Sequence, residues 1–73
     1  MSFTDAAERI LRDAAKPVSY SKIAQEALRQ GLIQSEAEDP AVSLYVVLRT
    51  EIKRRKERNE PQRFNFLGNG VFE

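Results

Sequence analysis

Residues 63–72 read RFNFLGNGVF, and in this stretch the spacing of the apolar residues is that of a strand rather than a helix. Phe64 and Phe66 alternate with a polar residue, as side chains on one face of a strand do. Gly68-Asn69-Gly70 has the composition of a tight turn, and Val71-Phe72 begins a return strand. The stretch therefore predicts a β-hairpin.

The segment before the hairpin predicts the longest helix, from Pro40 to about Arg58. Asp39 is an N-cap residue, and Pro40 suits the first helical position, where its missing N–H costs nothing. Asn59 can adopt the left-handed conformation that ends a helix, and Pro61 prevents continuation. One narrow stripe of this helix is expected to face the core, and it consists of Ala41, Tyr45, Leu48 and Ile52.

Two shorter helices are predicted further upstream. Ser2 is the N-cap of the first, which runs to about Ala15. Pro17 ends it and opens a brief extended link, predicted to be a short strand, before Ser19 caps the second helix. Gly31 supplies a left-handed residue after that helix. The apolar faces consist of Phe3, Ala7, Ile10, Leu11 and Ala14 in the first helix and of Tyr20, Ile23, Ala24, Ala27 and Leu28 in the second.

Helix, short strand, helix, loop, long helix and hairpin is the element order of a winged helix-turn-helix. This is an α+β fold that is mostly α, with three helices and a small hairpin wing in a two- or three-stranded sheet. The chain also resembles the HARE-HTH family over residues 3–72. The resemblance lies in AAERILRDAAKPVSYSKIAQEALRQGLI, in LRTEIKRR at the end of a helix that starts with proline, and in RFNFLGNGVF. Its most specific parts are KPVSYSKIAQEAL and RFxxLGxGVF.

The resemblance implies a DNA-associated adaptor that is usually fused to other domains, and it does not imply catalysis. The family occurs in additional-sex-combs-like chromatin proteins, homeobox proteins, restriction endonucleases and the RNA polymerase delta subunit. We expect one domain over residues 1–73, and the very short last strand suggests that it was cut from a longer protein. The expected location is the bacterial cytoplasm or nucleoid, or the nucleus if the source is a eukaryote.

The composition argues against several classes of function. The chain has no cysteine and no histidine, so we expect no metal site, no cofactor and no small-molecule substrate. Its longest apolar run, residues 44–48, is far shorter than the roughly 20 residues of a membrane span. Glu51 and Lys53, with Asp39 upstream, mimic a nuclease motif, but residues two apart on a helix point away from each other. We therefore expect no enzyme active site in this chain.

The charge is unevenly distributed along the chain. Residues 1–48 hold five basic and seven acidic residues, whereas residues 49–63 hold seven basic and three acidic ones. The basic run EIKRRKER, residues 51–58, can neutralise DNA phosphates, or it can be the solvated end of a helix with a Glu51–Arg55 pair. A cluster of one sign this dense exceeds what helix capping requires, which favours the phosphate interpretation.

The face of the long helix opposite its core stripe is the one that a winged helix places in the major groove. Hydroxyl, guanidinium and methyl groups on such a face can contact base edges. The alternative is that Val46 and Val47 pack under another element. The full set of expected DNA-binding residues is Ser43, Val46, Val47, Thr50, Lys53, Arg54, Arg55, Lys56, Arg58, Arg63 and Asn69.

Two features differ from many members of the family. The loop before the long helix is acidic, with Ser35-Glu36-Ala37-Glu38-Asp39-Pro40, and the wing tip carries Asn69 where a basic residue is common. Both remove positive charge where a winged helix approaches a phosphate backbone. The leading function is non-catalytic binding of double-stranded DNA as a targeting module of a larger protein. The alternative is a protein-interaction module that uses the outward face of the long helix and the acidic loop.

Overall fold

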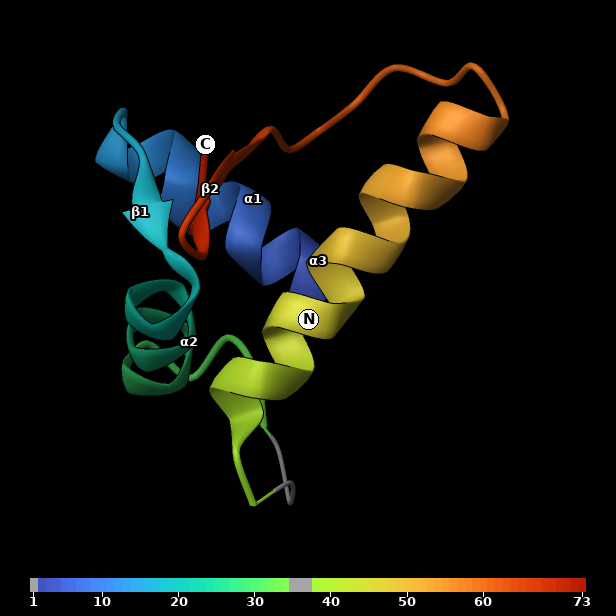
Figure 1. Ribbon diagram of the computed structural model, residues 1–73. Coiled ribbons are helices and arrows are strands. Elements are labelled where there is room, and N and C mark those ends of the chain that lie inside the picture. The colour runs from blue at the N-terminus through green and yellow to red at the C-terminus, as the bar shows by residue number, and fades with distance from the viewer. Residues whose placement is uncertain (1, 35–37) are drawn as a thin grey trace.

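The computed structural model describes residues 2–34 and 38–73 of the chain. Its elements run in the order α1 (Phe3–Ala14), β1 (Val18–Ser19), α2 (Tyr20–Arg29), α3 (Pro40–Glu57), β2 (Phe66–Gly68) and β3 (Val71–Phe72), as Figure 1 shows. Three helices and a small antiparallel sheet of three strands form a mostly helical structure. The predicted fold class, a winged helix-turn-helix, is confirmed.

The helices begin and end where short-range signals place them. The side-chain oxygens of Ser2, Ser19 and Asp39 each accept a hydrogen bond from the backbone N–H three residues further on, at 3.2, 3.3 and 3.4 Å. Such N-caps satisfy one of the free N–H groups at a helix start. After α1 the left-handed residue is Ala15, and after α3 it is Asn59, both with φ of 55°. The predicted helix ends are therefore correct to within one or two residues.

The sheet has the strand order β1-β3-β2, so the last and shortest strand lies in the middle. In β3, Phe72 pairs with Val18 of β1 on one side and with Phe66 of β2 on the other. The first hairpin strand begins at Phe66 rather than at Phe64, although the backbones of Asn65 and Glu73 still exchange two hydrogen bonds of 2.9 and 3.0 Å. Pairing on both sides explains how a strand of two residues holds its place.

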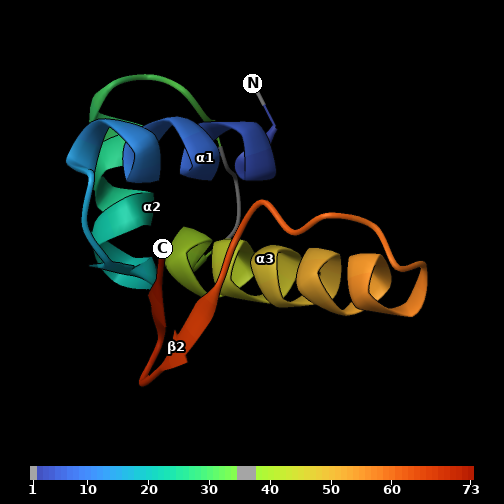
Figure 2. The same ribbon diagram turned by 90° about the horizontal axis from the view of Figure 1, so that it is seen from above.

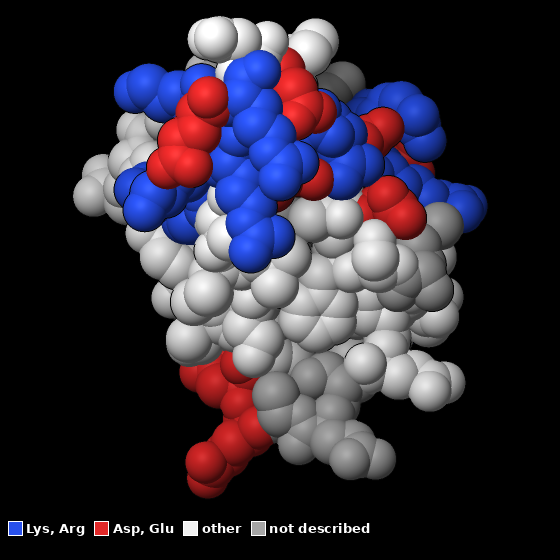
Figure 3. Space-filling model, turned by 90° about the vertical axis from the view of Figure 1, so that its right-hand side faces the viewer, with Lys and Arg blue, Asp and Glu red and all other residues white. Residues whose placement is uncertain are grey.

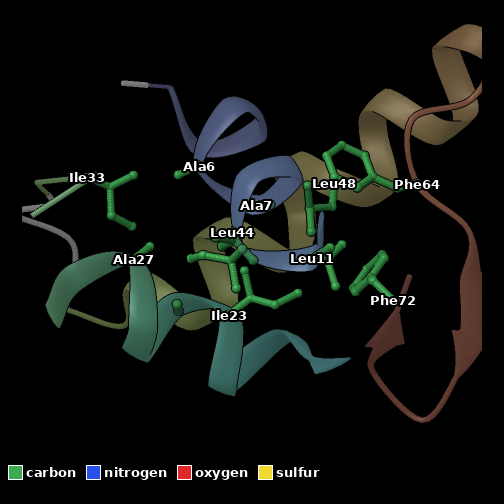
Figure 4. Packing of buried hydrophobic residues seen from close by; sticks show 12 residues of the cluster. Ala6, Ala7, Leu11, Ile23, Ala27, Ile33, Leu44, Leu48, Phe64 and Phe72 are labelled. Carbon is green, nitrogen blue, oxygen red and sulfur yellow. The ribbon is translucent and has the colours of Figure 1, made fainter. Parts of the chain in front are cut away.

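The core lies between the three helices and the hairpin, as Figure 4 shows. In α3 the fully buried side chains are Leu44 and Leu48, whereas Tyr45 and Ile52 are partly buried and pack against the cluster. Leu44 was not part of the predicted stripe. It is buried because α1 and α2 both contact α3, which moves the buried centre of the helix toward them. The buried cluster consists of Ala6, Ala7, Ile10, Leu11, Ile23, Ala24, Ala27, Ile33, Leu44, Leu48, Phe64 and Phe72.

Aromatic side chains join the hairpin to α3 and α2. Tyr45 lies 5.0 Å from Tyr20 and 5.9 Å from Phe72, measured between ring centroids, and Phe66 lies 5.1 Å from Phe72. Gly70, at the hairpin turn, approaches Tyr20 so closely that a Cβ atom there would lie 2.7 Å from the ring. The hairpin is thus fixed beside α3. Of the helices that the structure describes, none has the length and apolar character to cross a membrane.

Candidate nucleic-acid interface

The C-terminal half of α3 projects past α1 and α2, as Figures 1 and 2 both show. This half carries the basic run that was singled out in the sequence. The chain then turns at Asn59 and returns along the helix toward the hairpin. The projecting half therefore presents its side chains to solvent on a face that α1 and α2 do not cover.

The residues predicted to face outward do lie at the surface. Val46 and Val47 are 55% and 37% exposed, and Arg54 is exposed, while Ser43 and Thr50 are half-buried. The alternative in which the two valines pack under another element is thereby excluded. A groove of about 410 Å³ runs between α3 and the start of α1, and its lining includes Thr4, Val46, Val47, Thr50, Arg54 and Arg58.

A second hollow, of about 430 Å³, lies on another side of α3. Thr50 borders both hollows, and here its neighbours are Arg49, Lys53 and Lys56. The guanidinium of Arg49 lies 4.0 Å from the centroid of the Phe66 ring, which places it beside the hairpin. Arg49 was not among the predicted site residues. Its spacing of four from Lys53 and seven from Lys56 was the signal that could have identified it.

Arg55 of the basic run is held by the protein itself. Its Nη1 donates a 2.8 Å hydrogen bond to the carbonyl oxygen of Pro61, and its Nε lies 3.9 Å from Glu51, the pair predicted as the structural alternative. Next to it, Gln62 Nε2 donates to the carbonyl oxygen of Ile52 at 2.9 Å. These contacts fix residues 59–63, the return segment, against α3. Arg55 therefore has a structural role alongside its predicted role in DNA binding.

Arg63 is surrounded by three carboxylates. Its Nη1 donates to Asp5 at 3.2 Å and to Glu8 at 3.0 Å, and its other nitrogens bond Glu51, with the Nε contact at 3.3 Å. The hydrogen bonds with Glu51 raise the pKa of Arg63 above its ordinary value. Hydrogen bonds from Ser2, and then from Arg63, lower the pKa of Asp5. A phosphate contact by Arg63, as predicted, would compete with these acids.

The remaining cations form what we call the basic patch, which consists of Arg49, Lys53, Arg54, Lys56 and Arg58. Within residues 2–34 and 38–73, the first four make no ion pair. Arg58 lies 3.8 Å from Glu60, and both side chains are largely exposed. Exposed pairs of this kind contribute little and yield readily to another anion. The basic patch is thus available to a negatively charged ligand.

Charge is distributed with a clear polarity along this face. Figure 3 shows Lys and Arg gathered around the end of α3, acidic side chains near its start, and an uncharged band between them. Glu38 and Asp39 are exposed at the acidic end. Residues 35–37 of the acidic loop, including Glu36, lie outside the described part of the chain. At the wing tip, Asn69 is exposed and has a φ of 53°.

The described residues offer little to a metal ion. In that part of the chain, no cluster of three or more His, Cys, Asp or Glu side chains has an arrangement that could hold a metal. Glu51, a member of the sequence motif that mimics a nuclease, is instead bonded to Arg63 and lies near Arg55. The chemistry of the exposed face of α3 is that of binding through charge, hydroxyl and methyl groups.

Comparison with known proteins agrees with this geometry. The sequence model of HARE-HTH, the ASXL and restriction endonuclease helix-turn-helix domain, matches residues 1–72. The searches of curated proteins and of solved structures found no match. Domains of the matched family generally bind DNA and are not catalytic on their own. With a match over almost its whole length, the chain belongs to the HARE-HTH family.

Proposed function

We propose that this chain is a non-catalytic module that binds double-stranded DNA and targets a larger DNA-processing or transcription-related protein to it. The observation that carries the proposal is the basic patch, a group of exposed cations beside the exposed outward face of α3. A surface of this kind neutralises phosphates, and the release of counterions then favours binding.

The two kinds of side chain on α3 have different roles in this proposal. Thr50 can exchange hydrogen bonds with base edges, Arg54 can pair with guanine through two hydrogen bonds, and Val46 can contact the methyl group of thymine. Ser43 and Val47 border the same face. Lys53, Lys56 and Arg58 neutralise phosphates, and the Asn69 amide at the wing tip can donate to one. Arg55 and Arg63 support this arrangement from the return segment.

The polarity of the face decides how the duplex is oriented. Glu38 and Asp39 repel phosphate at the start of α3, while the basic patch attracts it at the end. The duplex is therefore expected to lie closest to the C-terminal half of the helix. A protein partner on this face is the second candidate, because exposed valines lie between the two charged ends.

Fluorescence anisotropy with a panel of duplexes at several salt concentrations tests the proposal. Binding should weaken linearly in log–log form as salt rises, and Lys56→Ala should lower that slope by about one for every sequence. Lys16→Ala is the matched control, because Lys16 is exposed and borders a different hollow, between α1, β1 and α2. If no duplex binds in a salt-dependent way, or if the two variants behave alike, the proposal is wrong.

A further inference from the structure

The exposed face of α3 is complementary to itself. Its start is acidic, with Glu38 and Asp39, and its end carries the basic patch. Between them lie exposed apolar side chains, since Val42 is 48% and Val46 is 55% exposed. Two such faces placed side by side in opposite directions bring each acidic end against a basic end, and they bring the apolar middles together.

The sequence spacing fits this arrangement closely. Glu38 and Arg54 lie eight positions before and after Val46, and Asp39 and Lys53 lie seven positions before and after it. In an antiparallel pair of helices with its two-fold axis at Val46, Glu38 of each copy therefore opposes Arg54 of the other. Asp39 likewise opposes Lys53. Each attraction occurs twice, because a two-fold interface uses the same surface of both copies.

We propose that the exposed face of α3 binds a second copy of this chain in an antiparallel, two-fold symmetric dimer with Val46 on the axis. Contact between the valines removes apolar surface from water, and the charged ends fix the direction and register of the helices. This proposal does not rest on the proposed function, although both use α3.

A second copy fits this face better than a uniformly charged ligand does. A polyanion attracts the basic patch and repels Glu38 and Asp39, whereas a second copy is complementary to both ends and to the uncharged middle. The contact surface is one face of one helix and its charges are exposed, so the dimer should be weak and sensitive to salt. Sedimentation equilibrium from about 10 μM to about 1 mM covers the range in which such small interfaces associate.

Charge reversal gives the sharpest test. Glu38→Lys places two lysines against two Arg54 side chains in its own dimer, and Arg54→Glu places two glutamates against two Glu38 side chains. Each variant alone should associate roughly tenfold more weakly than the unmodified chain, since two attractions become two repulsions. In an equimolar mixture the heterodimer has both pairs attractive, so association should return. Lys16→Glu and Asp13→Lys, which change charges outside this face, should have no effect.

A change on the axis provides independent evidence. Val46→Lys brings two cations together at the centre of the dimer and should abolish association. Because Val46 is 55% exposed, the melting temperature of the variant should stay close to that of the unmodified chain, which shows that it still folds. The same variant adds a positive charge to the face, so its affinity for DNA should not fall.

These results separate the dimer from DNA binding. Glu38→Lys should strengthen duplex binding and Arg54→Glu should weaken it, and mixing them should restore nothing for DNA. If the unmodified chain is monomeric at about 1 mM in low salt, the dimer is excluded and the proposed function is unaffected. Association that the single reversals leave unchanged, or that their mixture does not restore, would exclude the antiparallel arrangement.

Discussion

At the scale of single residues, Gly70 is the position with least freedom to change. Its φ is 75°, and a Cβ atom would meet the Tyr20 ring at 2.7 Å, while that ring is held against Tyr45. Gly70→Ala should therefore lower the free energy of unfolding by roughly 2–4 kcal/mol, through backbone strain and overpacking together. Urea denaturation followed by circular dichroism measures this.

Gly31 is the matched control for that change. Its φ is 70°, so alanine there is strained to a similar degree, but no atom lies within 4 Å of the added Cβ. Gly31→Ala should cost roughly 1–2 kcal/mol from strain alone. Equal losses for the two variants would show that the approach of the hairpin turn to Tyr20 is unimportant for stability.

Arg63 shows how one side chain can connect three segments of the chain. Arg63→Met leaves Asp5, Glu8 and Glu51 close together without their cation, and we expect a loss of about 1–2 kcal/mol in the free energy of unfolding. Arg29→Met is the control, because Arg29 pairs with Glu26 one turn away on the same exposed helix surface, and its loss should be about 0.5 kcal/mol or less. Urea denaturation at low and high salt compares the two. Losses of equal size would contradict the connecting role of Arg63.

At the scale of elements, α3 divides into a buried side and a free side. Leu48→Ala should lower the free energy of unfolding by about 2–5 kcal/mol, because Leu48 is fully buried. Changing both Val46 and Val47 to serine should cost less than about 1 kcal/mol, since both are exposed and the two residue types have similar helix propensity. Thermal melts decide this, and a large drop for the double variant would place the valines in the core after all.

The elements differ in how far the sequence alone determines them. The ends of α1, α2 and α3 were predictable because N-caps and left-handed residues act within a few positions of the chain. The ion pairs of Arg63 with Asp5 and Glu8 were not, because they join residues 58 and 55 positions apart. Apolar periodicity contains no information about which acid a distant arginine meets.

The same distinction applies to the candidate site. The outward face of α3 was predictable from helical spacing, and the exposure of Val46, Thr50 and Arg54 agrees with it. The position of Arg49 beside Phe66 depends on where the hairpin packs, and the burial of Leu44 depends on how α1 and α2 meet α3. Both are consequences of tertiary packing.

At the scale of the whole molecule, charge polarity matters more than net charge. The chain has a formal net charge of only +1, yet the basic patch and the acidic start of α3 lie at opposite ends of one exposed face. A ligand therefore experiences attraction at one end and repulsion at the other. Both the proposed DNA binding and the proposed dimer depend on this separation, with opposite requirements for the acids.

Removing one acid tests that dependence for DNA. Glu38→Gln spares the cap made by Asp39, so stability should hardly change, while affinity for a duplex should rise about twofold near 10 mM salt. Near 150 mM salt the gain should vanish, because the screening length falls to about 8 Å. The measurement uses labelled chain at nanomolar concentration, so that self-association is negligible, and Asp13→Asn on α1 is the control. Unchanged affinity at low salt would mean that bound DNA does not extend past the start of α3, and the acids would then act in contacts with protein alone.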